Sequence, residues 1–137
     1  MSPPRDAAFQ VGCSIPVIRM LDETATRQFY GEVLGFTVDW EHRFRPTPDS
    51  TLYMQVHWGQ SVLHLNGHAD ADSPVTEVRI PVNDLTAFCG YVNERWPGGG
   101  VSPVDPRGTG DPTEVNLRDP SGNMLVFWLR AEVDPPR

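Results

Sequence analysis

Histidine is the side chain in this sequence best suited to acid–base or metal chemistry near neutral pH, and His64 stands out among the four histidines. It interrupts the otherwise apolar run 62–65, where an imidazole must find a hydrogen-bonding partner. We therefore expect His64 to line a pocket. His42 and His57 are further candidates, although histidines at strand edges are often solvated, and His68 is expected in an exposed loop.

Other familiar catalytic arrangements are not visible in the sequence. There is no Ser-His-Asp order for nucleophilic attack and no CxxC pair. The run Pro97-Gly98-Gly99-Gly100 follows a predicted helix instead of opening one, so we interpret it as a helix stop and not as a phosphate-binding loop. Cys13 and Cys89 lie in segments of apolar periodicity, which favours reduced, buried thiols with a packing role.

The elements that position these residues follow one order twice: a strand, a helix and then several strands. Asp22 is a good N-cap for a first helix that ends at Gly35, and Asp84 is a good N-cap for a second helix that ends at Pro97. A long Pro/Gly loop is expected over 103–112. The expected strands are residues 12–20, 36–44, 51–58, 61–66, 75–82, a strand starting at Val101, 114–117 and 123–129.

A step of about 62 residues relates the two halves of the chain. This step carries Asp22 to Asp84, and the same step carries Ile15 to Glu77 and His64 to Val126. Residue identities are not strongly repeated, so the repeat is one of pattern. We expect a single domain over residues 1–137, with one module at about 11–68 and a second at about 74–130.

Two stretches of sequence mark a known fold. One is Ile15-Pro16-Val17-Ile18-Arg19 followed by Asp22, Phe29-Tyr30 and Leu34-Gly35-Phe36, and the other is Leu117-Arg118-Asp119-Pro120-Ser121-Gly122-Asn123-Met124-Leu125-Val126-Phe127. Together they resemble the vicinal oxygen chelate superfamily, which includes glyoxalase I, extradiol dioxygenases, fosfomycin-modifying enzymes and bleomycin-binding proteins. The resemblance spans about residues 11–130 and implies an α+β fold, in which two βαβββ modules form a curved mixed sheet around a ligand-binding cup. Such a resemblance indicates a fold and not a reaction.

The metal enzymes of that superfamily take one ligand from the first strand and one from the last strand of each module. The resemblance places Ile15 and His64 at these positions in the first module, and Glu77 and Val126 in the second. A site of this kind needs about three protein ligands, and neither Ile15 nor Val126 has a donor atom. We therefore expect no complete metal centre and no cofactor, with His64 and Glu77 as the remaining candidates for a divalent metal. Glu77 would instead pair with His64 and favour its imidazolium form.

Alternation along strands predicts which side chains face the cup once His64 and Glu77 are taken as inward. The opposite set, which includes Leu63, Leu65, Val78 and Ile80, should face the helices. The predicted ligand-binding residues are Arg19, Trp40, His42, Tyr53, His57, His64, Glu77, Arg79, Val126 and Trp128.

Charge and hydropathy narrow the class of partner. The net charge of −7 argues against a nucleic-acid partner, because nothing would neutralise a row of phosphates, and it favours cationic ligands. No window approaches the roughly 18 apolar residues of a membrane span, and the start of the chain has no apolar signal-peptide run. We therefore expect a cytoplasmic protein that does not engage membranes.

Two functions from different classes remain open. The first is a binding protein that sequesters an aromatic, antibiotic-like or cationic small molecule, as bleomycin-binding proteins do, in a pocket between the subunits of a homodimer. The second is a lyase, isomerase or dioxygenase that uses a non-standard metal held by His64, Glu77 and a third histidine. A metal-free enzyme would instead use His64 and Glu77 as a general base and its orienter. We favour binding without catalysis.

Overall fold

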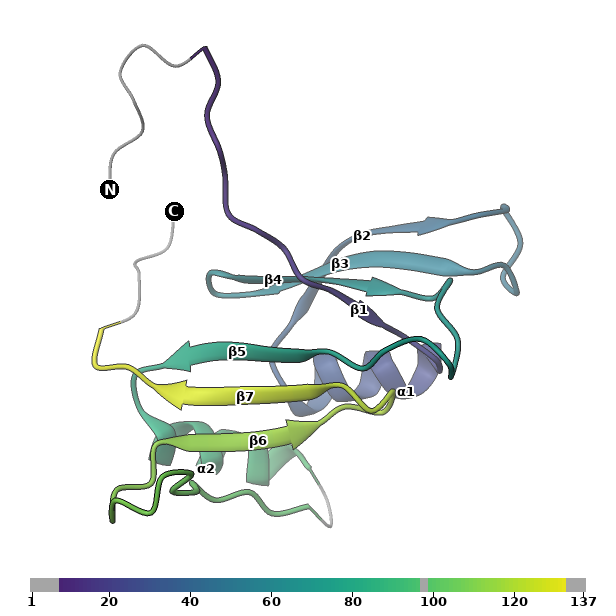
Figure 1. The fold of residues 1–137 in the computed structure, drawn as a ribbon. Coiled ribbons are helices and arrows are strands. Elements are labelled where there is room, and N and C mark those ends of the chain that lie inside the picture. The colour runs from purple at the N-terminus through teal and green to yellow at the C-terminus, as the bar shows by residue number, and fades with distance from the viewer. Residues whose placement is uncertain (1–7, 97–98, 133–137) are drawn as a thin grey trace.

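Two separate β-sheets and two helical segments make up the computed structural model, which describes residues 8–96 and 99–132 (Figure 1). The first sheet has the strand order β1 (Val17–Arg19), β4 (Ser61–Asn66), β3 (Leu52–Trp58), β2 (Thr37–Arg43). The second sheet has the order β5 (Glu77–Val82), β7 (Met124–Leu129), β6 (Glu114–Arg118). Helix α1 (Glu23–Arg27) continues as a π-helical segment, η1 (Gln28–Val33), and α2 (Leu85–Arg95) follows β5. The predicted α+β class is confirmed.

The step of 62 residues is preserved in the structure. The carboxylate of Asp22 accepts the N–H of Ala25 at 2.9 Å, and that of Asp84 accepts the N–H of Ala87 at 2.9 Å. In the first sheet β1 pairs with β4 in parallel, with Val17 opposite His64. In the second sheet β5 pairs with β7 in parallel, with Arg79 opposite Val126. The two halves therefore share one plan in their helix caps and in their parallel strand pairs.

The second module departs from that plan. The strand predicted to start at Val101 does not form, and within the described residues this segment contributes an isolated bridge between Val104 and Glu114. Proline has no N–H for a strand ladder, and the prolines of the 103–112 loop interrupt the segment repeatedly. The predicted first strand is also shorter than expected, because pairing begins at Val17, directly after Pro16.

A single hydrophobic core joins the two modules. It contains the helix residues Phe29, Tyr30 and Phe88 together with one face of each sheet. The sheet residues in this core are Ile18, Leu52, Met54, Val56, Leu63, Leu65, Val78, Ile80, Val115, Leu117, Leu125 and Phe127. The predicted helix-facing residues Leu63, Leu65, Val78 and Ile80 all lie in this core. The opposite face of each sheet, which we call its outward face, turns away from the shared core.

The turn between β6 and β7 anchors the second module on the first. The buried carboxylate of Asp119 accepts the hydroxyl hydrogen of Tyr30 at 2.7 Å and the backbone N–H of Asn123 at 2.8 Å. Burial, and then the negative charge of Asp119, raises the pKa of Tyr30 well above its usual value. The side chain of Ser121 accepts the N–H of Leu21 at 2.9 Å. The RDPSGN stretch is thus a structural junction between modules.

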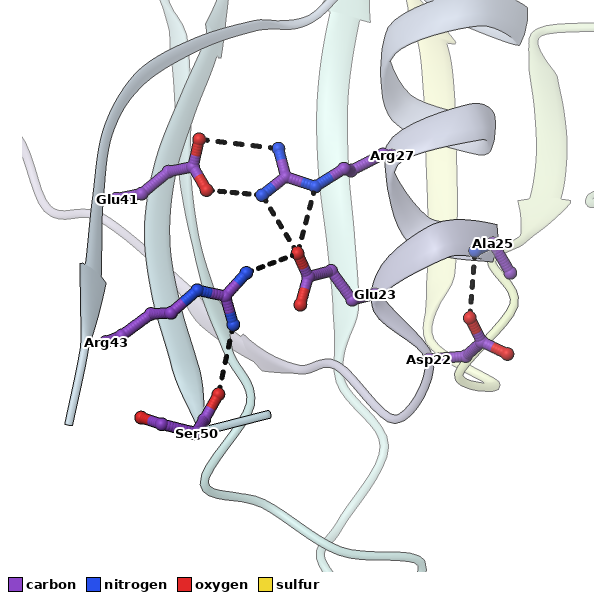
Figure 2. A network of polar contacts seen from close by, with 7 residues as sticks. All are labelled: Asp22, Glu23, Ala25, Arg27, Glu41, Arg43 and Ser50. Carbon is purple, nitrogen blue, oxygen red and sulfur yellow. Dashed lines mark hydrogen bonds and ion pairs between the residues drawn. The ribbon is translucent and has the colours of Figure 1, made fainter. Parts of the chain in front are cut away.

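An ion-pair network holds the edge strand β2 against α1 (Figure 2). Glu23 accepts hydrogen bonds from Arg27 at 3.1 Å and from Arg43 at 2.7 Å, and Arg27 also pairs with Glu41. The hydrogen bond from Arg43 is the main reason that the pKa of Glu23 lies below its usual value. Because β2 is exposed along almost its whole length, this network adds polar contacts to a strand that has little apolar burial.

Candidate functional site

His64 lies on β4, and both of its ring nitrogens have partners on β3. Its Nδ1 is 2.8 Å from the hydroxyl oxygen of Tyr53, and its Nε2 is 2.9 Å from Oε1 of Gln55. Gln55 is directly opposite His64 in the β3–β4 register, and Tyr53 lies two residues away on the same side of the strand. The expected hydrogen-bonding partner of His64 therefore comes from the neighbouring strand of its own module.

The network continues onto the edge strand β2. Nε2 of Gln55 donates to Oδ2 of Asp39 at 2.9 Å, and Nδ1 of His57 lies 2.5 Å from Oδ1 of the same carboxylate. Strict alternation from Trp40 places Asp39 on the opposite face, so the sequence prediction missed it. A β-bulge between Val38 and Trp40 adds one residue to β2 and brings both Asp39 and Trp40 into contact with the outward face. No residue type marks this bulge in the sequence.

For a neutral His64 ring, the partners fix the direction of each hydrogen bond in this series of side chains, which we call the relay. An ionised carboxylate only accepts, so the amide nitrogen of Gln55 faces Asp39 and its amide oxygen faces His64. Nε2 of a neutral His64 then carries the proton, and its Nδ1 accepts the hydroxyl hydrogen of Tyr53. The hydrogen bond from Gln55, with a smaller contribution from His57, holds the pKa of Asp39 below its usual value.

Trp40 covers the relay with an aromatic ring. Its ring is stacked on that of Tyr53, with centroids 6.1 Å apart and planes 13° apart, and it meets the His64 ring edge to face at 5.3 Å. Trp40 nevertheless remains 42% exposed. We call Trp40 and Tyr53 the platform. It offers a broad π-surface directly beside polar groups whose orientation is already fixed.

The outward face of the second sheet is organised differently. Arg79 donates to Glu114 at 2.6 Å and lies 3.7 Å from Glu77. Val126 on the central strand is 3% exposed but is not a member of the shared core, so it lies beneath this layer of side chains. A cleft of about 300 Å³ separates Arg79 and Trp128 from the loop that contains Asp105, Pro106, Arg107 and Thr109.

Within one chain, the structure does not bring His64 and Glu77 together. They lie on different sheets: His64 is engaged by Tyr53 and Gln55, and Glu77 by Arg79. The reason is that the helix-facing sides of the two sheets pack on one core, which turns both outward faces away from it. Arg19 has a structural role, because its guanidinium donates to the backbone carbonyl oxygens of Ala71, Ser73 and Ser121.

The remaining predicted residues lie as follows. His42 is exposed on β2, opposite Tyr53 in the β2–β3 register. Cys89 is buried as expected, and burial raises the pKa of its thiol, whereas Cys13 is exposed, which contradicts its expected burial. A second cleft, of about 560 Å³, was not predicted. Its lining comes from the β3–β4 turn, the end of β5 and the core aromatics: Trp58, Gly59, Gln60, Ser61, Ile80, Pro81, Val82, Asn83, Phe88, Phe127 and Arg130.

Comparison with known proteins assigns the family. The family model described as "Glyoxalase superfamily protein" matches residues 6–132. This chain belongs to the glyoxalase superfamily. No curated protein matches it significantly. Among solved structures, the glyoxalase superfamily protein is similar to a bleomycin resistance determinant encoded on transposon Tn5, with 18% identity, a TM-score of 0.63, and 89% of this chain and 100% of that chain covered.

Two further similar structures have names that state what they bind. A bleomycin-binding protein complexed with bleomycin shares 19% identity at a TM-score of 0.59, covering 88% of this chain and 99% of that one. TnmS3, an antibiotic-binding protein from Streptomyces sp. CB03234, shares 20% identity at a TM-score of 0.59, covering 88% and 98%. At these identities the likeness establishes the fold of the glyoxalase superfamily protein.

The donor set of the glyoxalase superfamily protein does not fit the metal site that its fold family implies. Ile15 and Val126 have no donor atom, and the nitrogens of His64 are already engaged in the relay. Across residues 8–96 and 99–132, no three His, Cys, Asp or Glu side chains are grouped so that they could hold a metal ion. Among the same residues, no helix is long and apolar enough to span a membrane.

Proposed function

We propose that this glyoxalase superfamily protein binds a small aromatic molecule on the outward face of the first sheet and does not transform it. The observation that carries the proposal is the platform, in which the exposed ring of Trp40 is stacked with the partly buried ring of Tyr53 beside the polar groups of the relay. An apolar surface with a few oriented polar groups is typical of small-molecule sites. The similar folds of a bleomycin-binding and an antibiotic-binding protein support the same function.

Both ring nitrogens of His64 are engaged by side chains of its own sheet. Nδ1 is bonded to Tyr53 and Nε2 to Gln55, so a base at His64 would act on a ligand only through the Tyr53 hydroxyl. Glu77, the second candidate for catalysis, is paired with Arg79 on the other sheet. A planar ligand that stacks on the platform would need no proton transfer.

We infer that a second copy of the chain completes the site. The outward faces of the two sheets turn away from the core of their own chain, so one chain leaves both uncovered. Val17, opposite His64, is 48% exposed, and Phe9 and Val11, on the segment before β1, are more exposed still. Apposing the first sheet of one protomer to the second sheet of its partner would unite the predicted residues in one cup and cover this apolar surface.

The charge of the protein favours cationic ligands. Its net charge is −7, and Asp39 holds its charge at the edge of the platform. A planar ligand with a positive group would gain from stacking on Trp40 and from this negative potential. The buried, reduced Cys89 agrees with a cytoplasmic location, which we also infer.

Calorimetric titration with bleomycin tests the proposal, with tryptophan fluorescence as a second readout. We expect saturable binding at micromolar drug, and a loss of about tenfold or more in affinity for Trp40→Ala, since a buried stacking contact is worth roughly 1–3 kcal/mol. Phe44→Ala is the matched control, because Phe44 is an exposed aromatic residue that follows β2 and lies outside the platform. Its affinity should be that of the unmodified protein.

Three results would contradict the proposal. Absence of saturable binding would remove the assigned function, and equal affinities for Trp40→Ala and Phe44→Ala would move the site away from the platform. Mass spectrometry of the recovered drug should show it unmodified, and a chemically altered product would show catalysis. Sedimentation of the protein alone tests the homodimer.

A further inference from the structure

The relay has one open end. When His64 is the neutral Nε2–H tautomer, Tyr53 donates its proton to Nδ1 of His64, so the phenol oxygen can accept a hydrogen bond from a ligand but cannot donate one. This oxygen is the edge substituent of the Tyr53 ring, which is stacked with the ring of Trp40. A ligand lying on the platform therefore meets a hydrogen-bond acceptor.

The acceptor character of Tyr53 originates at Asp39, three hydrogen bonds away along the relay. The carboxylate orients the amide of Gln55, the amide selects the tautomer of His64, and that tautomer fixes the proton of Tyr53. Each link is a hydrogen bond of 2.8–2.9 Å between partly exposed or exposed side chains on adjacent strands. His57 holds the carboxylate from the other side and adds no competing donor to Gln55.

We propose that Asp39 is a positioning residue that makes the site prefer aromatic ligands with an N–H or O–H donor over ligands with an acceptor, an inference that rests on the proposed binding function. Asp39 acts through Gln55 and His64 and does not need to touch the ligand. A donor completes the relay at the Tyr53 oxygen. An acceptor placed there meets a lone pair, and the loss of one hydrogen bond corresponds to roughly a five- to tenfold weaker affinity.

Removing the Asp39 carboxylate should abolish the preference of the site for ligands that donate a hydrogen bond. In Asp39→Ala nothing fixes the amide of Gln55, which can then turn its nitrogen toward His64. His64 would then carry its proton on Nδ1 in part of the population and would free the Tyr53 hydroxyl to donate. The site should keep its platform but should no longer prefer ligands with a hydrogen-bond donor over ligands with an acceptor. A structural role for Asp39 alone would lower all affinities together and leave their ratio unchanged.

Two uncharged probes separate the hydrogen-bonding effect from charge: indole, which presents a ring N–H donor, and quinoline, which presents a ring nitrogen acceptor. At about pH 8 both are neutral, so the lost charge of Asp39 has little direct effect on either. In calorimetric or protein-observed NMR titrations, the unmodified protein should bind indole about five to ten times more tightly than quinoline. Asp39→Ala should bring this ratio close to one.

Glu41→Ala is the matched control, since it removes a carboxylate from the same strand that pairs with Arg27 and lies outside the relay. Its indole-to-quinoline ratio should stay at the unmodified value. Gln55→Leu interrupts the relay without changing charge and should abolish the preference as Asp39→Ala does. This second variant keeps the test decisive if Asp39→Ala does not fold.

Nitrogen NMR of the His64 ring gives a readout that does not depend on ligand binding. We expect the Nε2–H tautomer in the unmodified protein and a mixture of tautomers in Asp39→Ala. An unchanged affinity ratio in Asp39→Ala, or an Nδ1–H tautomer in the unmodified protein, would overturn the proposal. If bleomycin and both probes fail to bind the unmodified protein, the proposed function fails and this inference fails with it. If bleomycin binds and neither probe does, the function stands and the inference fails. If both bind equally, the function stands and the inference alone is wrong.

Discussion

The outward faces of the two sheets share the same strand pairing but have different side chains and different chemistry. In the first sheet, His64 on the last strand is held by Tyr53 and Gln55 in a directed relay beneath an exposed tryptophan. In the second sheet, the equivalent position is Val126, buried beneath ion pairs of Arg79. The first sheet has an edge strand with a bulge, whereas the second has a proline-rich loop in its place.

The difference shows which parts of the repeat are constrained by folding. Helix caps and core-facing positions match between modules because both modules must pack on one core. The turns that follow the third strand do not match. Gly59-Gln60 in the first module lines a cleft, while Asp119 in the second is buried at the junction between modules. Ligand chemistry is concentrated in one module and the junction in the other.

The largest expected effect is a loss of stability when the turn that joins the two modules is altered. This effect tests whether the junction lies in the second module and the ligand site in the first. Asp119→Ala removes the acceptor for the Tyr30 hydroxyl at 2.7 Å and for the Asn123 backbone and side chain at 2.8 and 2.9 Å. Leaving several buried donors without a partner should lower the free energy of unfolding by about 3 kcal/mol or more. Urea denaturation followed by circular dichroism measures this change.

Gln60→Ala, in the equivalent turn of the first module, is the control for that measurement. Gln60 is exposed, so its substitution should change the free energy of unfolding by less than about 0.5 kcal/mol. If Asp119→Ala and Gln60→Ala lowered the free energy of unfolding equally, the β6–β7 turn would have no special role in joining the modules.

Much of the fold could be predicted from the sequence because it follows from local rules. The caps at Asp22 and Asp84, the apolar alternation of β4 and β5, and the 62-residue step all derive from short-range patterns of residue type. The sequence wrongly predicts a strand starting at Val101. Val101 and Val104 have strand propensity, but the prolines that follow cannot donate to a strand ladder, and only an isolated bridge forms within the described residues.

The site was predicted in part, for a physical reason. His64, Tyr53 and Trp40 do come together, because alternation along adjacent strands places them on one face. Asp39 was missed because the bulge depends on pairing between β2 and β3, which no single strand reveals. His64 and Glu77 do not pair within one chain, because pairing would require the two outward faces to meet there.

A comparison of Trp40 with Trp128 sharpens the distinction between the two faces. If a second copy apposes its second sheet to the platform, Trp128 contributes to the same cup from the partner. Trp128→Ala should then weaken bleomycin binding about threefold to tenfold, less than Trp40→Ala, because it lies at the rim of a neighbouring cleft. Calorimetry measures both variants. Unchanged affinity in Trp128→Ala would confine the site to the first sheet.

The alkaline stability of the protein should depend on Tyr30. The folded state raises the pKa of Tyr30, mainly through burial, so above the usual value near 10 the unfolded chain loses this proton while the folded chain keeps it. Stability should therefore fall with rising pH by up to about 1.4 kcal/mol per unit from this group alone. Tyr30→Phe should be less stable at neutral pH but lose less stability between about pH 10 and 11. Parallel losses in both proteins would contradict this origin.

The smallest expected change in the free energy of unfolding comes from the ion pairs that hold edge strand β2 of the first sheet. Glu23 lies between Arg27 and Arg43, and its pKa is lowered chiefly by the hydrogen bond from Arg43. Its stabilisation is present above the unfolded pKa and is lost as the pH falls through the lower folded value. Glu23→Gln should cost about 0.5–1 kcal/mol at neutral pH, since the pairs are partly exposed, and the difference should vanish toward about pH 3 and at high salt.

The matched control for Glu23 is Glu94→Gln, which removes an exposed partner of Arg95 on α2. A glutamate that is 79% exposed and 3.6 Å from its partner should contribute nothing measurable at any pH. Urea denaturation at several pH values compares the two variants. If both lose the same stability, or if the Glu23→Gln difference is independent of pH, the edge strand is not held by this network. The bulge that positions Asp39 would then depend on strand pairing alone.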